Sequence, residues 1–314
     1  MSSIVTLTMN PAIDISTATQ RVEPVSKLRC HDARRDPGGG GVNVARVANR
    51  LGGDVTAIYP IGGLVGQLFK QMVDEQGIKS VIVPLRDETR EDFTVHDEAT
   101  GQQYRFVLAG PQLSETEWKN CLAALAAIES KPQFVCASGS LPPGAPDDLY
   151  RRVAKIVAGW SSKFVLDTSG AALRSALREG VYLIKPNLQE LRDLTNAPLA
   201  DQAAMIGACR DLIGRGCCQV IALTLGAEGA LLVTADRAWR AGPLPVIVVS
   251  TVGTGDSFLG GMVWALASGM TLEQSFRYAV AAGSAAVLAP GTELCKPQDV
   301  RRLSGQVTLE AASS

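Results

Sequence analysis

The sequence predicts an α/β protein in which a parallel β-sheet is covered by helices on both faces. Short apolar runs alternate with helical patterns through the last two-thirds of the chain, and these runs lack the alternating polar residues of half-exposed strands. Ligands on such sheets bind beyond the carboxyl ends of the strands. The expected strands are Phe134–Ala137, Phe164–Asp167, Val181–Ile184, Val220–Thr224 and Ala230–Val233, and the expected helices lie near 114–129, 147–160, 188–195 and 201–215.

The N-terminal third has a different pattern, in which polar and apolar residues alternate as in half-exposed strands. This pattern predicts a small antiparallel sheet made of two excursions of the chain, 10–36 and 88–108, while the core domain comprises 1–9, 37–87 and 109–314. A small exposed sheet needs a partner surface, so we expect a substrate lid, a dimer contact or both. Its expected strands are Ile13–Thr19, Lys27–Arg34, Asp92–Glu98 and Gln103–Val107, which flank a helix at Val42–Leu51.

Composition limits the classes of function. The chain has 314 residues, a formal net charge of −1 and 46% hydrophobic residues, which is typical of a globular protein. No block of like charges indicates a nucleic-acid or membrane-surface partner, and no apolar run is long enough to cross a bilayer. Seven scattered cysteines without a Cys-x-x-Cys pair, and only two histidines, argue against a zinc site. The odd cysteine count and the lack of a secretory signal predict a cytoplasmic protein.

The most informative motif is Ser250–Ser257, in which Gly253 and Gly255 precede Asp256 and an apolar helix begins at once. Glycine lets the backbone approach a ligand, and a helix start offers unpaired N–H groups to an anion. An acid at that place is more useful as a base than as a phosphate binder. The motif therefore indicates phosphoryl transfer to a hydroxyl, with Asp256 as the general base. The alternative is an ordinary helix-capping aspartate.

Two earlier motifs predict a polyol site. The glycines Gly38–Gly41 permit backbone contact with a small polar ligand, and Asn43 can both donate and accept hydrogen bonds. Asp14 follows the first expected strand, where a carboxylate can accept hydrogen bonds from sugar hydroxyls. The alternatives are a flexible linker for the glycines and a turn-forming role for Asp14.

Later turns carry further polar groups. Lys185 and Asn187 would face a strand end, and Glu190 would either hold Mg²⁺ through water or stabilise the first turn of a helix. The turn Thr224–Gly229 either brackets a nucleotide or is a simple hairpin, and the serines of Ser138–Gly144 would touch a sugar.

Three basic residues fall in the expected small sheet: Lys27, Arg90 and Arg105. Basic residues on a lid fit a substrate that carries its own phosphate. The alternative is solvated surface charge, in which case the substrate would be a neutral sugar.

Together, these motifs resemble those of the ribokinase-like (PfkB) carbohydrate kinases, and the resemblance covers nearly the whole chain. Gly38–Asn43 and Thr251–Asp256 are similar to the two defining motifs of that family, and Lys185–Asn187 with Glu190 is similar to the motif between them. Asn10–Asp14 and the glycine run resemble its phosphosugar branch, within which the 6-phosphofructokinase isozyme 2 group is the most similar.

The resemblance implies a Rossmann-type three-layer α/β/α core with a small β-sheet lid that clasps a second copy in a homodimer. It also implies ATP-dependent phosphorylation of a phosphorylated ketohexose. Fructose 6-phosphate is the expected substrate, and fructose 1-phosphate or tagatose 6-phosphate is the alternative. The expected cofactors are ATP and Mg²⁺, and some family members also hold K⁺.

The resemblance also implies a role for individual residues. Asp256 would accept the proton of the sugar hydroxyl, beside an anion hole formed by Gly253, Thr254 and Gly255. The sugar would bind Asp14, Gly39, Gly40, Asn43 and Ser140, and its phosphate would bind Lys27, Arg90 and Arg105. ATP would bind Lys185, Asn187, Thr224, Gly226 and Gly229, with Mg²⁺ near Glu190. The K⁺ site corresponds to Ser250, Val252, Ala286 and Gly291.

Two positions depart from the family pattern. Thr254 stands where a small alanine is usual and would narrow the anion hole, and Glu293 stands beside the K⁺ loop where similar proteins have arginine.

Three competing functions are a kinase of neutral sugars or nucleosides, an inactive binding protein of the same fold, and a Rossmann dehydrogenase. The lid cations argue against the first, and the intact Asp256 with its glycines argues against the second. The third fails because no Gly-x-Gly-x-x-Gly follows the first strand with an acid about 20 residues later.

Overall fold

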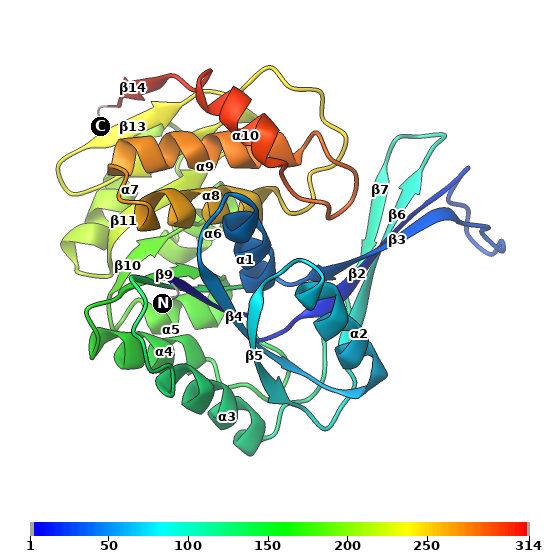
Figure 1. Cartoon of the computed structure of the whole chain (residues 1–314). Helices are drawn as coiled ribbons and strands as arrows, with labels where there is room; N and C mark the ends of the chain where they lie inside the picture. The colour runs from blue at the N-terminus through cyan, green and yellow to red at the C-terminus, as the bar shows by residue number, and fades with distance from the viewer. Residues whose placement is uncertain (1–2, 313–314) are drawn as a thin grey trace.

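The computed structural model describes residues 3–312, and its centre is a ten-stranded sheet between two layers of helices (Figure 1). The strands from β11 to β5 run parallel to their neighbours, whereas β12, β13 and β14 continue the sheet in antiparallel fashion. In sheet order they are β14 (Leu309–Ala311), β13 (Ala238–Ala241), β12 (Ala230–Val233), β11 (Cys218–Thr224), β10 (Val181–Ile184), β9 (Lys163–Asp167), β8 (Phe134–Ser138), β1 (Ile4–Leu7), β4 (Val55–Ile61) and β5 (Lys79–Pro84).

A hydrophobic core lies on each face of this sheet, because successive strand residues point to opposite faces. In β1, Ile4 packs into one core, while Val5 and Leu7 pack into the other. The first core is covered by α1 (Gly40–Arg50), α2 (Gly63–Asp74), α8 (Thr254–Ala267), α9 (Leu272–Ala286) and α10 (Pro297–Ser304). The second is covered by α3 (Glu115–Ala126), α4 (Leu149–Ala158), α5 (Gly170–Ala176), α6 (Leu188–Thr195) and α7 (Gln202–Gly214).

This architecture confirms the predicted α/β/α class, and the strands and helices expected in the last two-thirds of the chain form close to their predicted bounds. One expectation was wrong: β12 pairs antiparallel with β11 instead of joining the parallel sheet. The two strands are joined only by a tight turn with the 3₁₀ helix Gly226–Glu228. A parallel connection needs a crossover of a dozen or more residues, and no such length separates them.

A second, four-stranded sheet projects from the side of the main body (Figure 1). Its order is β3 (His31–Gly38), β2 (Ala12–Thr19), β6 (Arg90–Asp97) and β7 (Gln103–Phe106). The sheet is mixed rather than antiparallel, because β2 and β6 pair in parallel. Both strands leave the core just after parallel strands, β1 and β5, so they enter the small sheet in the same direction.

The strand expected at Lys27–Arg34 was misplaced: β3 runs from His31 to Gly38, and Lys27 lies in the preceding loop. Pro37 makes the observed strand hard to recognise, because proline has no N–H group to donate to a ladder. An edge strand tolerates proline, and β3 is at the edge of its sheet.

Within residues 3–312, no helix combines the length and apolar composition that a membrane crossing requires. The cysteines are free thiols, and most of them are buried. The same residues contain no group of three or more His, Cys, Asp or Glu side chains that could enclose a metal ion. Packing therefore holds the described fold together without covalent cross-links.

Close contact between α8 and its neighbours fixes the helix that carries Asp256. A Cβ atom added to Gly261 would lie 2.8 Å from both Ala282 Cβ and the Tyr278 carbonyl oxygen of α9. On the other side, a Cβ atom on Gly260 would lie 2.7 Å from Val47 Cβ of α1. The paired glycines therefore let α8 approach two helices at once.

We expect Gly261→Ala to lower the free energy of unfolding by about 1–3 kcal/mol, because the added methyl group forces α8 away from α9. The matched control is Gly207→Ala in α7, where nothing lies within 4 Å of the new Cβ atom. That change should raise stability by about 0.5–1 kcal/mol through helix propensity. Urea unfolding of both variants measures the difference, and equal midpoints would contradict the packing argument.

Candidate active site

The start of α8 lies beside the carboxyl ends of the central strands. Gly253 precedes the helix with a φ of 72°, a left-handed conformation that glycine adopts without strain. This residue before the helix has no side chain that could make a capping hydrogen bond, and the Thr254 hydroxyl group donates to the Thr251 carbonyl oxygen at 2.9 Å. Asp256 is therefore not the capping residue. The first N–H groups of α8 are left for an anion.

Asp256 meets Asn43 across the two helix starts. Asn43 Nδ2 of α1 donates to Asp256 Oδ2 at 2.9 Å. Desolvation by the surrounding protein and the charge of Asp167 raise the pKa of Asp256 to about 6, against the opposing effect of the hydrogen bond from Asn43. This carboxyl group consequently titrates near neutral pH, where it can take up a proton and release it again.

Asp14 of β2 lies against the glycine run. A Cβ atom on Gly38 would lie 2.2 Å from Asp14 Oδ2, and one on Gly40 would lie 2.3 Å from Ser138 Oγ. The backbone of this run thus passes between Asp14 of β2 and Ser138 at the end of β8, and larger residues would not fit. Burial, together with the charges of Asp92 and Asp256, raises the pKa of Asp14 to about 7, and Arg46 opposes this shift.

Lys185, after β10, points toward the same helix start. Its Nζ lies 3.3 Å from Asp167 Oδ1 and would lie 3.2 Å from a Cβ atom on Gly255. Although desolvation opposes the charged form, Asp167, Asp256 and Glu190 raise the pKa of Lys185. Sequence reasoning missed Asp167, although an aspartate that ends an apolar strand was a usable signal.

The residues expected to bind nucleotide come from neighbouring turns. Asn187 and Thr224 pair through their backbones, and Gly226 and Gly229 bound the turn after β11. Asn187 and Glu190 form a capping box at the start of α6, where each side chain accepts the other's backbone N–H at 2.8 Å. Both side chains therefore cap α6. Desolvation raises the pKa of Glu190.

The structure separates the three basic residues of the small sheet. Arg90 is half-buried, donates to the Asn10 carbonyl oxygen at 3.0 Å and pairs with Asp92 at 3.3 Å, while its Nε has no hydrogen-bond partner. Arg90 and Ser140 both line a hollow of about 480 Å³. Arg105 is exposed, and its charge lowers the pKa values of Asp14 and Asp256. Lys27 is exposed and makes no hydrogen bond or ion pair with any residue of 3–312.

Pairing places both arginines on one face of this sheet. Asp14 pairs with Asp92, and Thr94 pairs with Arg105 on the adjacent strand. Because residues two apart share a face, Arg90 and Arg105 lie on the same face as Asp14.

The loop expected to bind K⁺ also comes together. Ser250 Oγ lies 3.4 Å from the Gly291 carbonyl oxygen and accepts the Val252 N–H at 3.2 Å, and Ala286 ends α9 nearby. Glu293 contacts Arg34 at 3.0 Å and Lys296 at 3.2 Å. Burial alone would raise the pKa of Glu293, but these two cations hold it below its usual range.

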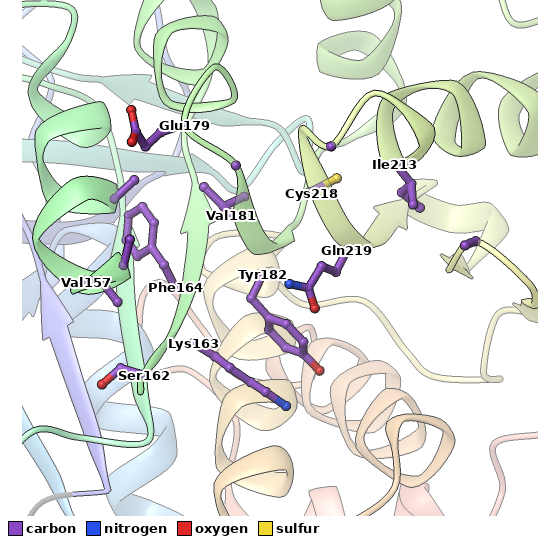
Figure 2. Close-up of a pocket in the computed structure, with 15 residues that line it drawn as sticks. Val157, Ser162, Lys163, Phe164, Glu179, Val181, Tyr182, Ile213, Cys218 and Gln219 are labelled. Atoms are coloured by element: carbon purple, nitrogen blue, oxygen red, sulfur yellow. The ribbon is translucent and has the colours of Figure 1, made fainter. Parts of the chain in front are cut away.

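A separate hollow of about 590 Å³ lies at the amino ends of the parallel strands, and Figure 2 shows residues that line it. Lys163, Tyr182 and Gln219 line it from the first residues of β9, β10 and β11, with Val157 and Ile213 from α4 and α7. The Asp256 cluster lies at the carboxyl ends of the strands, where ligands of open α/β sheets bind. This hollow is therefore separate from that cluster.

Comparison with known proteins agrees with this arrangement. Residues 3–299 match the model of the pfkB family carbohydrate kinases. The chain belongs to this family of kinases. The match spans the small sheet, every strand of the large sheet except β14, and every motif of the cluster around Asp256.

Named relatives of this kinase are phosphofructokinases. ATP-dependent 6-phosphofructokinase isozyme 2 of Mycobacterium tuberculosis is 43% identical over 95% of the chain and 88% of its own length. The protein of that name from Escherichia coli is 38% identical over 96% and 98%. A 1-phosphofructokinase from Borreliella burgdorferi is 33% identical over 98% of each chain.

Solved structures of kinases give the same picture. Phosphofructokinase-2 of Escherichia coli in complex with potassium has a TM-score of 0.93 at 38% identity, covering 98% of this chain and 99% of that one. Its complex with fructose-6-phosphate has a TM-score of 0.90 at 36% identity, with the same coverage. A tetrameric inhibited form of that enzyme has a TM-score of 0.91 at 37% identity, again over 98% and 99%.

The raised pKa of Asp256 predicts that removing its carboxyl group increases the free energy of unfolding of this kinase, by an amount that depends on pH. Between the ordinary value of 3.8 and the folded value of about 6, the folded protein binds more protons than the unfolded chain. Stability therefore falls as pH rises through that window. We expect Asp256→Asn to be more stable than the wild type by about 1–3 kcal/mol near pH 8, and by less near pH 4.

Urea unfolding at both pH values measures this difference. The control is Asp299→Asn, which changes an aspartate in the first turn of α10, where it pairs with Arg302 at 2.9 Å. A stability difference for Asp256→Asn that does not change with pH would contradict the desolvation argument.

Proposed function

We propose that this kinase transfers the γ-phosphoryl group of ATP to fructose 6-phosphate, which yields fructose 1,6-bisphosphate. The observation that carries the proposal is the Asn43–Asp256 pair at the start of α8, with Asp14 beside it and two arginines on the facing sheet. The 6-phosphofructokinase names of two relatives support this substrate. Fructose 1-phosphate is the alternative, favoured by the relative named 1-phosphofructokinase, and tagatose 6-phosphate is a further one.

In this mechanism the sugar lies between the two sheets. Asp14 and the backbone at Gly39 and Gly40 bind its hydroxyl groups, and Asn43 orients Asp256. Asp256 takes the proton of the attacking hydroxyl as its oxygen bonds to the γ-phosphorus and the bond from that phosphorus to ADP breaks, a role suited to a carboxylate whose pKa is about 6. Arg90, Arg105 and Lys27 bind the phosphate that the sugar already carries, with Ser140 beside Arg90.

The transferred group meets the start of α8. The backbone N–H groups of Gly253, Thr254 and Gly255 face its oxygens, and Lys185 adds a positive charge from the other side. Closure of the small sheet excludes water that would otherwise hydrolyse ATP. Asn187, Thr224, Gly226 and Gly229 bind the nucleotide.

The charges of the site fit a divalent cation. Asp14, Asp256, Asp167 and Glu190 form a series of carboxyl groups in which each is within electrostatic reach of the next, and the positive charges that act on them include Lys185, Arg105 and Arg46. Residues 3–312 contain no group of three or more His, Cys, Asp or Glu side chains that could hold a metal ion by themselves. Mg²⁺ would therefore be held by Glu190 together with the ATP phosphates. When bound, it neutralises negative charge on the phosphates.

We extend the proposal to K⁺ and to assembly. The oxygens of Ser250, Val252, Ala286 and Gly291 form a neutral donor set of the kind that holds K⁺. The outer face of the small sheet exposes Phe93 and Phe106, which pair across β6 and β7 and would be covered in a homodimer. We propose that the enzyme acts in glycolysis in the cytoplasm.

The general-base role predicts a loss of turnover in Asp256→Asn. We expect kcat to fall by about 10²–10⁴-fold, with little change in the KM for ATP, because the hydroxyl proton loses its acceptor. A coupled ADP-release assay measures both constants. Asp299→Asn serves as the control and should retain wild-type kcat. Near-normal turnover of folded Asp256→Asn would exclude the proposed role.

The phosphate role of the small sheet predicts a selective defect in Arg105→Met. We expect the KM for fructose 6-phosphate to rise about 10- to 100-fold through the lost charged contact, while turnover of unphosphorylated fructose does not change. Arg35→Met is the matched control, because Arg35 pairs with Ile15 and lies on the opposite face of the sheet from Asp14.

The same assay with MgATP and fructose 6-phosphate, tagatose 6-phosphate, fructose 1-phosphate, fructose and ribose identifies the substrate. The proposal expects the highest kcat/KM for fructose 6-phosphate. Turnover of the neutral sugars alone would keep the Asp256 chemistry and remove the phosphate roles of the lid arginines.

A further inference from the structure

Arg46 is the largest side chain that is completely buried, and it lies one turn after Asn43 in α1. Its guanidinium group donates from all three nitrogens. Nε donates to Gln76 Oε1 at 3.0 Å, and Nη2 donates to Asp36 Oδ1 at 3.0 Å. Nη1 donates to the Pro37 carbonyl oxygen at 2.9 Å, to Asn43 Oδ1 at 3.1 Å and to the Thr292 carbonyl oxygen at 3.2 Å.

Simple space filling does not explain this residue. Burial lowers the pKa of Arg46 to about 10 against the opposing effect of Asp36, so the group is still charged at neutral pH. A buried ion pair generally adds little net stability compared with apolar side chains of the same volume. The contacts of Arg46, rather than its volume, are therefore the feature to explain.

The contact with Asn43 settles how that amide is oriented. A guanidinium group can only donate hydrogen bonds, so the atom of Asn43 that faces Arg46 must be the acceptor Oδ1. The amide nitrogen is then turned toward Asp256 Oδ2, to which it donates at 2.9 Å. With the amide reversed, an N–H group would face Arg46 and an oxygen would face the carboxylate, and both contacts would be repulsive.

Arg46 also joins α1, the helix that carries Asn43, to the small sheet. Asp36 of β3 binds Arg46 on one side and Arg34 Nε at 2.8 Å on the other, and it accepts from Thr292 Oγ1 at 3.4 Å. Arg34 continues to Glu293 at 3.0 Å. Strand β3, α1 and the loop before α10 are thus held by one charge cluster, of which Arg46 and Asp36 are the buried members.

We propose that Arg46 is a positioning residue for phosphoryl transfer: it fixes the Asn43 amide so that Nδ2 donates to Asp256, and it ties this pair to β3 through Asp36. The inference rests on the proposed function, because it assumes that Asp256 is the base. Arg46 has no contact with substrate in this role and acts only through Asn43.

The charged groups around Asp256 define what a test must keep constant. Asp14 faces it from β2, Asp167 and Lys185 face it from the ends of β9 and β10, and Arg105 faces it from β7. The buried thiol of Cys136 in β8 is also within electrostatic reach. Arg46→Lys preserves all of these groups and the positive charge at position 46. It removes the planar fork that donates to Asn43, Pro37 and Asp36, and also to Gln76 and the Thr292 carbonyl oxygen.

The test is the pH dependence of kcat at saturating ATP and fructose 6-phosphate. In Arg46→Lys the Asn43 amide is free to turn, and the hydrogen bond that lowers the pKa of Asp256 is lost or weakened. We expect the acid limb of the profile to shift upward by about one pH unit, with kcat reduced about tenfold at its maximum. The substrates titrate identically with every variant, so the shift belongs to the enzyme.

The matched control is Gln76→Met, which removes the partner of Nε but leaves the path from Arg46 to Asn43 intact. We expect it to lower stability and leave the acid limb at the wild-type pH. If Arg46→Lys does not fold, Asp36→Glu replaces it. That change keeps every charge but displaces the guanidinium group by the length of one methylene, so a smaller shift in the same direction is expected.

Two outcomes overturn the inference, and they are distinguishable. If Asp256→Asn retains the wild-type acid limb, Asp256 is not the base, and the proposed function fails together with the role of Arg46. If the limb depends on Asp256 but neither Arg46→Lys nor Asp36→Glu moves it, the function stands, and Arg46 serves stability alone.

Discussion

The hydrogen bond from Asn43 to Asp256 joins two helix starts that lie 213 residues apart in the chain, and the arrangement of the site depends on it. It requires α1 and α8 to meet at one edge of the sheet. Gly260 makes this possible, because a side chain there would collide with Val47 of α1. The glycine run before α1 has the same effect, since it leaves room for Asp14 and Ser138 on either side.

Desolvation is the second constraint on the site. Asp14 and Asp256 have raised pKa values because protein has replaced much of the water around them. This arrangement lowers stability above the titration range, yet it holds a carboxyl group near the pH at which proton transfer is efficient. Lys185 and Arg105 reduce this loss of stability, because their positive charges lower the pKa of Asp256.

Much of the fold was predictable because the strands of the parallel sheet are continuous apolar runs. The pairing of strands was less accessible. The parallel contact of β2 with β6 depends on where each strand leaves the core, and β3 tolerates Pro37 only because it lies at an edge. No local pattern records either fact. The strands β4 and β5, before the second excursion of the small sheet, were not anticipated.

The sequence alone determined the family and the residue types of the site, because glycines, Asn43 and Asp256 stand at fixed spacings in short motifs. Only the tertiary structure decided which groups face one another. It brought Asp167 to Lys185 and placed Arg46 behind Asn43, while Lys27 makes no hydrogen bond or ion pair within residues 3–312. The physical reason is that burial and hydrogen-bond partners arise between segments distant in the chain, whereas a motif records only its neighbours.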